Sequence, residues 1–305
     1  MGTNRKLRFY SLLYIELDET RLLQGKKRKD KERIDIFVRN AAMLDKSLTW
    51  FSPQGLTLLT NAPEALCNSF KRVGHEIRYE KIDFDIDGLP KDIPFYSAHF
   101  KIDAFRYLGS RPDDEYSVLL DNDMVQLRPF PKVFNEIVEK GIPTCYYLTI
   151  KDKIDEAVDS CREADKDLPI MQWTGGEYWG WVNRWYKTLY KSCKIEIPKY
   201  LAYLHMGQYH IGDEMITTMA LAKIKNDVDL IDISHYNIVK RYWGMHETES
   251  LEYFKPVISH LPADKIWLAG ISIDSVTNSA DFLKKYKRHW FKFRIIQRLR
   301  SMLGR

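Results

Sequence analysis

"VLLDNDMVQL", residues 118–127, places two aspartates one residue apart inside an apolar run. Three apolar residues lead up to Asp121, and Met124 and Val125 follow Asp123 directly. An apolar run of this kind is typical of a strand buried in a sheet, where an uncompensated carboxylate is costly. The sequence therefore indicates that a strand ends at Asp121 and that the two carboxylates have a role at that point.

The segments before this run alternate between strand and helix patterns. Strands separated by helices predict a mostly parallel α/β sheet that is covered by helices. Ligands bind such sheets at the carboxyl ends of the strands, which is where the two aspartates lie. We expect strands over residues 8–17, 55–61, 75–84 and 115–127, and helices over 62–74 and 97–109.

The second half of the chain has weaker patterns. Residues 172–186 combine glycine with tryptophan, which we interpret as a loop near a ligand or as a tight turn wrapped by core aromatics. We further expect strands or loops over residues 141–150, 229–239 and 255–268, and helices over 151–167 and 210–224.

Composition indicates a globular chain with a basic end. The four cysteines form no C-x-x-C motif, which predicts a reduced, cytoplasmic setting. The net charge is +5, but nine lysines and arginines lie after residue 283, so the rest of the chain carries a net charge of −4. No apolar stretch approaches the roughly 18 residues of a membrane span.

A D-x-D pair at a strand end suits a metal ion. Mg²⁺ and Mn²⁺ prefer oxygen ligands and often bind one or two carboxylates together with substrate phosphates. The ion would neutralise a diphosphate as it leaves. The alternative interpretation is an ordinary β-turn, in which Asp and Asn are common.

The segment "YSVLLDNDMVQLRPF" (116–130) resembles the metal-binding D-x-D strand of GT-A glycosyltransferases. Further pieces that resemble this class follow the order expected of it. They are "HFKIDAFRYLG" (99–109) for the helix with basic donor-binding residues, "WTGGEYWGW" (173–181) for an acceptor-side loop, "IGDEM" (211–215) for the acidic site near the reacting sugar carbon, and "SHLPADKIW" (259–267) for the late His–Lys element of family 8 retaining transferases.

The resemblance implies a GT-A, Rossmann-like α/β fold over residues 1–280, with a mostly parallel central sheet flanked by helices. It also implies a set of site residues. The metal ligands for Mn²⁺ or Mg²⁺ would be Asp121, Asp123 and His260; the donor contacts Tyr10, Tyr14, Lys101, Arg106, Asp121 and Lys265; and the catalytic acid residues Asp213, Glu214 or Glu177.

Residues 281–305 form a basic C-terminal segment. Apolar residues recur there at steps of three or four, from Leu283 to Leu303, between lysines and arginines. This pattern predicts an amphipathic helix on an anionic membrane surface. The alternatives are a helix docked on the protein's own core and a nucleic-acid-binding tail.

The sequence thus favours a metal-dependent glycosyltransferase that uses a nucleotide-sugar donor, preferably a UDP-sugar. The expected acceptor is a glycan or lipid-linked saccharide of surface polysaccharide or lipopolysaccharide synthesis, at the cytoplasmic face of a membrane and without a nucleic-acid partner. One alternative is a sugar-phosphate nucleotidyltransferase, although residues 14–29 lack the Gly-rich phosphate loop typical of that class. The other is a non-catalytic protein that binds membrane or nucleic acid.

Overall fold

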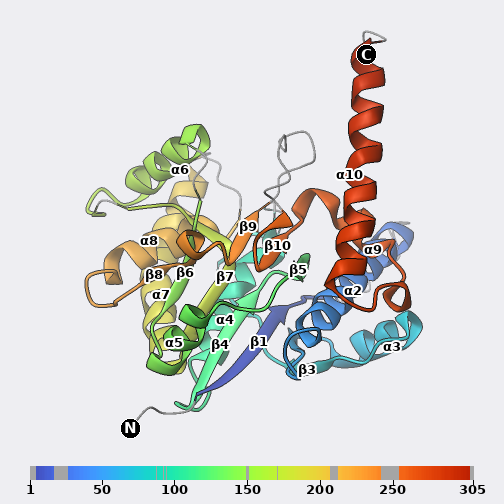
Figure 1. The fold of residues 1–305 in the computed structure, drawn as a ribbon. Coiled ribbons are helices and arrows are strands. Elements are labelled where there is room, and N and C mark those ends of the chain that lie inside the picture. The colour runs from blue at the N-terminus through green and yellow to red at the C-terminus, as the bar shows by residue number, and fades with distance from the viewer. Residues whose placement is uncertain are drawn as a thin grey trace.

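The computed structural model describes residues 5–16, 27–86, 88–91, 93, 95–148, 151–169, 171–206, 212–241 and 254–302. A seven-stranded sheet lies at the centre, in the order β3-β2-β1-β4-β7-β6-β8 (Figure 1). Its strands pair in parallel except β7, which is antiparallel to both β4 and β6. The strands are β1 (Lys6–Leu12), β2 (Leu56–Thr60), β3 (Arg78–Lys81), β4 (Glu115–Leu120), β6 (Thr144–Tyr147), β7 (Thr174–Val182) and β8 (Ile231–Asp232).

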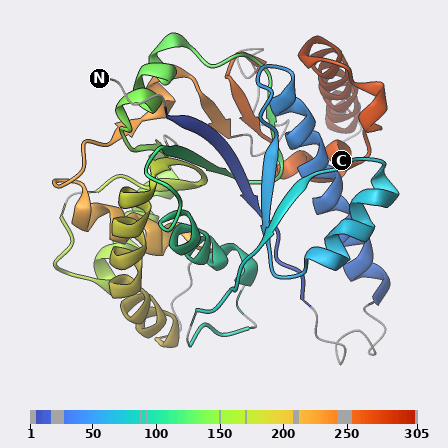
Figure 2. The same ribbon diagram turned by 90° about the horizontal axis from the view of Figure 1, so that it is seen from below.

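Helices cover both faces of this sheet (Figure 2). One hydrophobic core unites the sheet with α2, α3, α5 and α10, and the other unites it with α4, α6, α7 and α8. This is the helix-covered, mostly parallel sheet that the alternating patterns predict. The helices are α2 (Lys27–Thr49), α3 (Pro63–Val73), α4 (Lys101–Leu108), α5 (Lys132–Lys140), α6 (Lys151–Ala164), α7 (Asn183–His205), α8 (Glu214–Ile224), α9 (Lys265–Ala269) and α10 (Ser279–Met302).

The predicted helix over residues 62–74 is confirmed as α3. It ends at Gly74, which has a left-handed φ of 72° and donates its N–H to the carbonyl oxygens of Lys71 and Phe70. Glycine adopts this conformation without the steric penalty that a Cβ atom brings. The helix can therefore stop there and return the chain to the sheet as β3.

The loop expected over residues 172–186 is wrong: Thr174–Val182 is the fully buried strand β7, between β4 and β6. Its glycines serve packing. A Cβ atom on Gly180 would lie 3.1 Å from the hydroxyl of Tyr116, which donates to the Gly180 carbonyl at 2.5 Å. The Trp181 indole donates to the carbonyl of Thr144 at 2.8 Å. The tryptophans thus belong to the centre of the fold.

A second sheet of three short strands positions the site. It consists of β5 (Met124–Gln126), β10 (Ile258–His260) and β9 (Val239–Arg241) in the order β5-β10-β9. Strand β10 runs antiparallel to β5, with His260 opposite Met124. Because Met124 follows Asp123 directly, this pairing brings a histidine from late in the chain beside the D-x-D pair.

Helix α10 has two different halves. Phe282 and Tyr286 are buried in the main core, and the ring of His289 stacks on Trp267 at 4.6 Å. The later part extends away from the body of the molecule (Figure 1). Its exposed large apolar side chains are those of Phe291, Ile295, Ile296 and Leu299. Leu303, a member of the predicted stripe, lies outside the described residues. Within the described part of the chain, no helix is both long and apolar enough to cross a membrane.

Candidate active site

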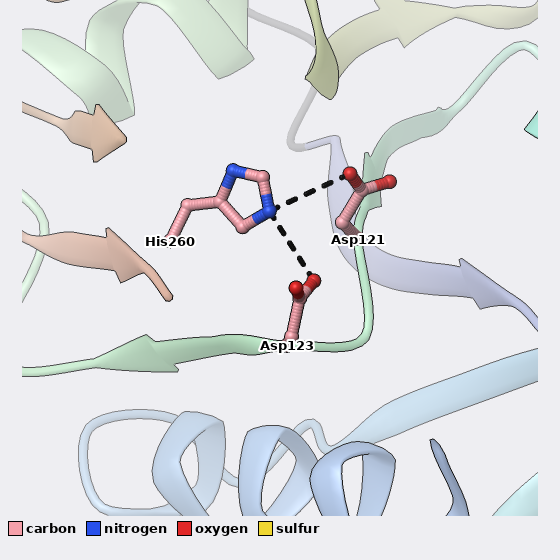
Figure 3. A group of neighbouring side chains, drawn as sticks. All are labelled: Asp121, Asp123 and His260. Atoms are coloured by element: carbon pink, nitrogen blue, oxygen red, sulfur yellow. Dashed lines mark ion pairs between the residues drawn. The ribbon is translucent and has the colours of Figure 1, made fainter. Parts of the chain in front are cut away.

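The two aspartates lie where β4 ends and β5 begins, and His260 is the last residue of β10. The three side chains point toward one another (Figure 3). The His260 Nε2 atom lies 3.2 Å from Asp123 Oδ1 and 3.7 Å from Asp121 Oδ2. One ligand atom from each residue lies within 4.8 Å of the other two. The structure therefore assembles the predicted set of metal ligands at the carboxyl end of β4.

This cluster fits a divalent cation in its chemistry and in its charge. Two carboxylates and an imidazole are ordinary ligands for such an ion. Glu177 Oε1 lies 3.5 Å from Nδ1 of His260, where a carboxylate orients a metal-binding ring. Five carboxylates and three permanent cations leave the site two negative charges in excess when His260 is neutral. The carboxylates are Asp121, Asp123, Glu177, Asp213 and Glu214, and the cations are Lys101, Arg241 and Lys265.

The histidine is held in a strongly acidic environment. Burial disfavours its charged form, but the carboxylates of Asp123 and Glu177 outweigh burial and raise the pKa of His260 to about 9. Burial likewise opposes ionisation of Asp123, yet the charges of His260 and Lys265 lower the pKa of its carboxyl. A proton and a metal ion therefore compete for the same ring nitrogen.

Two lysines flank the D-x-D pair. Lys101, in the first turn of α4, is buried and places its Nζ atom 3.0 Å from Asp121 Oδ1 and 2.6 Å from the carbonyl oxygen of Gly176. Lys265, in the first turn of α9, lies 3.1 Å from Asp123 Oδ2 and is 37% exposed. Burial opposes the charge of Lys101, but Asp121 and Asp213 raise its pKa, so this lysine stays protonated. Both lysines can offer positive charge to phosphate oxygens.

Glu177 and Glu214 are fixed by hydrogen bonds. Glu177 accepts the guanidinium of Arg241 through both carboxylate oxygens, one of them at 2.7 Å from Nε. Glu214 accepts from Arg241 Nη2 at 2.5 Å, from the Gly176 amide at 3.1 Å and from the Trp173 indole at 2.8 Å. Burial opposes ionisation of Glu177, but Arg241 and His260 lower its pKa to about 2.

Asp213 has a different environment from its neighbour Glu214. Only 3% of this residue is exposed, and its Oδ2 atom accepts no hydrogen bond from any described residue. The nearest cation is Lys101, whose Nζ lies 3.4 Å away. Burial raises the pKa of Asp213 to about 6 against the opposing effect of Lys101. Gly176 leaves room for Asp213 and Lys101 to lie close together, because a Cβ atom at this position would lie 3.1 Å from Asp213 Oδ2 and 3.0 Å from Lys101 Nζ. Of the three predicted catalytic acids, Asp213 has a carboxylate oxygen that the described residues hold by an ion pair alone.

Arg241 belongs to the site although the sequence did not point to it. It ends β9, is 8% exposed and links Glu177 to Glu214. No local motif marks it, since its position depends on the pairing of β9 with β10. A buried arginine between two acids holds both in one orientation.

Three of the residues predicted to bind the donor have their described contacts outside the cluster around the D-x-D pair. The Tyr10 hydroxyl donates to Glu115 at 2.7 Å, at the start of β4 and not at its end. Tyr14 lies past the carboxyl end of β1 and packs against aromatic rings, the nearest being Phe100 at 4.7 Å. Arg106 donates to the carbonyl oxygen of Asp83 at 2.7 Å.

Comparisons with known proteins agree with this fold. No protein-family model matches the sequence, and no curated protein matches it either. Among solved structures, the apo form of mouse xyloside xylosyltransferase 1 superimposes with a TM-score of 0.51 at 10% identity, covering 85% of this chain and 98% of that one. The galactosyltransferase LgtC, in complex with donor and acceptor sugar analogs, gives a TM-score of 0.53 at 13% identity, covering 86% of this chain and 95% of that one. The chain therefore has the fold of GT-A glycosyltransferases, as the sequence predicts.

Proposed function

We propose that this protein is a metal-dependent glycosyltransferase that moves a sugar from a nucleotide-sugar, preferably a UDP-sugar, to an acceptor hydroxyl. One observation carries the proposal: Asp121, Asp123 and His260 converge at the carboxyl end of β4 in a GT-A fold. Sheets of this kind bind their ligands at that edge. An ordinary turn would not require the two aspartates to meet a histidine from a different strand.

The residues around the cluster suit a diphosphate. Asp121, Asp123 and His260 would hold Mn²⁺ or Mg²⁺, which neutralises diphosphate charge when bound. Lys101 and Lys265, on either side of the aspartates, attract the phosphate oxygens and favour departure of the nucleoside diphosphate. Tyr14 and Arg106 stay our proposed contacts for the nucleotide at the margin of the site.

Asp213 is our proposed carboxylate for the reacting sugar. Its Oδ2 atom, which accepts no hydrogen bond from the described residues, can stabilise positive charge that develops at the sugar carbon or accept the proton of the acceptor hydroxyl. Glu214 and Glu177 act beside it, and Arg241 positions both of them.

The acceptor that we propose is a glycan or lipid-linked saccharide of surface polysaccharide or lipopolysaccharide synthesis. Exposed Phe291, Ile295 and Leu299 are spaced four residues apart on α10, among lysines and arginines. Such a face binds the interface of an anionic membrane. The protein would then work at the cytoplasmic surface of the membrane that holds a lipid-linked acceptor.

Thermal shift with nucleotides tests the proposed function. UDP, GDP, CMP and their sugars are added to the protein with and without Mn²⁺, and the melting temperature is recorded. A ligand of the folded state at about 100 times its Kd adds about 2.7 kcal/mol to stability. We expect a Mn²⁺-dependent rise with one nucleotide, loss of that rise in Asp123→Asn, and no loss in Asp159→Asn, which changes an exposed acid of α6.

Two results would overturn the proposal. One is the absence of any shift in folded protein with every nucleotide. The other is a shift that is equally large in Asp123→Asn, because the nucleotide would then bind without the D-x-D pair.

A further inference from the structure

A hollow of about 450 Å³ lies at the opposite edge of the main sheet from the candidate active site. Arg8 of β1, Thr57 of β2 and Arg78 of β3 line it on the sheet, and residues that follow α4 form another wall. The active-site aspartates follow the carboxyl end of β4, whereas this hollow reaches Glu115 at its amino end. The six residues of β4 span about 20 Å, so the two sites are separate.

Every carboxylate that lines the hollow already has a partner. Glu115 is 5% exposed and accepts hydrogen bonds at 2.7 Å from Tyr10 and from Ser117. These acids therefore leave little negative charge to attract a cation into the hollow. The ion pairs are Glu115 with Arg111 (3.4 Å), Glu80 with Arg111 (3.7 Å) and Asp114 with Lys6 (3.0 Å).

Two guanidinium groups in the hollow lack a carboxylate. Among the described residues, neither Arg8 nor Arg78 has an ion pair; Arg78 donates to the carbonyl oxygen of Gly55 at 2.8 Å. Their strands flank β2, so their backbones lie about 10 Å apart. Arginine side chains are long enough for both guanidinium groups to reach one ligand across that distance. Across its lining, four cations (Lys6, Arg8, Arg78 and Arg111) face three carboxylates (Glu80, Asp114 and Glu115), so the hollow carries a net charge of +1.

We propose that this hollow binds a small phosphate-bearing molecule, with its phosphate between Arg8 and Arg78. A phosphate group is attracted by the guanidinium groups of Arg8 and Arg78, and each planar guanidinium binds its oxygens in pairs. The volume suits a metabolite. Tyr79, which is 41% exposed, also lines the hollow. This site is independent of the proposed transferase function.

Calorimetric titration with inorganic phosphate and with glucose 1-phosphate tests the site. The titrations use the full chain at constant ionic strength with EDTA, so that no metal supports phosphate binding at the D-x-D pair. We expect Arg8→Gln/Arg78→Gln to weaken binding by about tenfold or more. The matched control Arg72→Gln/Arg162→Gln, which removes two exposed arginines elsewhere, should bind like the unchanged protein. Lys265→Gln should also bind phosphate normally.

Several results would overturn the proposal. They are the absence of binding at millimolar phosphate, equal binding by the Arg8→Gln/Arg78→Gln variant, and a comparable loss in Lys265→Gln, which would assign the phosphate to the active site. Citrate binding as tight as glucose 1-phosphate binding would mean a site for anions in general. If the double variant does not fold, Arg78→Gln alone replaces it, since that residue is exposed on an edge strand.

Discussion

Asp213 and Glu214 are adjacent in the sequence, but their carboxylates have different surroundings. Glu214 is held by Arg241, the Gly176 amide and the Trp173 indole, whereas Asp213 Oδ2 pairs with Lys101 and accepts no hydrogen bond from a described residue. A carboxylate that stabilises charge developing on the substrate needs an oxygen that no hydrogen bond occupies. A carboxylate that only positions its neighbours needs hydrogen bonds that fix its orientation. This difference is the basis for separating their roles.

The first prediction concerns Asp213→Asn. We expect this variant to keep Mn²⁺-dependent nucleotide binding, because the proposed metal ligands and the two flanking lysines are unchanged. We expect its transfer activity to fall by about 10²-fold or more. Thermal shift measures the binding, and release of nucleoside diphosphate measures the transfer. Normal turnover in Asp213→Asn would exclude the residue from the reaction. Asp227→Asn, in the exposed turn after α8, serves as the control.

The second prediction concerns Arg241→Met. This change removes the guanidinium that pairs with both carboxylate oxygens of Glu177, whose side chain is fully buried. Breaking a buried ion pair by removing one partner costs about 3–5 kcal/mol, which urea denaturation measures. The double variant Arg241→Met/Glu177→Gln should recover part of this loss, since no buried charge is left at position 177. Equal stability of Arg241→Met and the unchanged protein would contradict the ion-pair geometry.

The sequence predicted some of these residues well and others not at all. Asp121 and Asp123 stand out because they interrupt an apolar strand, and His260 is found through its spacing to Lys265. Arg241 carries no such signal, because a lone arginine on a short strand is common and its two acids lie far away in the sequence. Only the three-dimensional pairing of strands brings it to Glu177.

At the scale of elements, β7 shows why local sequence patterns can misassign a strand in the densely packed core. Glycine is depleted in strands, so "TGGEYWGW" is typical of a loop. Its glycines instead make room for groups from neighbouring elements: Tyr116 at Gly180, and Lys101 and Asp213 at Gly176. The need for that room comes from tertiary neighbours and cannot be read locally. The helices and parallel strands, by contrast, follow from local periodicity and end signals such as Gly74.

The third prediction concerns the end of α6. Asp165 accepts hydrogen bonds from Lys199 of α7 at 2.6 Å and forms an ion pair with Lys223 of α8 at 3.0 Å. Burial opposes its ionisation, but these lysines lower its pKa to about 2. The folded carboxyl has a lower pKa than the unfolded one, so the stabilisation is complete above about pH 4 and is lost as the pH falls toward 2.

Asp165→Asn should therefore lower the free energy of unfolding at pH 7 by about 1–2 kcal/mol, given that both lysines are about a third exposed to solvent. Near pH 2 the variant and the unchanged protein should have the same stability. Urea denaturation at both pH values measures the difference, with Asp159→Asn, an exposed acid of α6, as the control. A deficit that is as large at pH 2 as at pH 7 would mean that packing, and not charge, is responsible.

At the scale of the whole molecule, α10 combines two of the roles that the sequence left open. Its first turns pack in the main core, and its later turns extend outward with apolar and basic side chains. The core-docked interpretation is thus confirmed for the first half of the helix, and the membrane-surface interpretation stays a prediction for the second half. The same helix contacts the segment that carries Lys265, since Tyr286 donates to Asp264 at 3.0 Å.

The fourth prediction concerns the outer half of α10. Ile295→Ser/Leu299→Ser should reduce binding to vesicles that contain anionic lipid by about tenfold or more, because both side chains are about half exposed and apolar. Vesicle sedimentation measures the bound fraction. Ile195→Ser/Met206→Ser removes two similarly exposed apolar side chains, one in α7 and one directly after it, and should have no effect. Equal losses in both variants would exclude α10 as the membrane-binding element.

The pairing of β10 with β5 has a consequence for how the protein is made. Residues 124–126 leave the ribosome long before residues 258–260, which complete the small sheet. At about 5–20 residues per second, the two events are roughly 7–27 s apart. During that interval the nascent chain carries both aspartates without the histidine. In the proposed function, binding of a metal ion through all three side chains would therefore follow the synthesis of the chain up to His260.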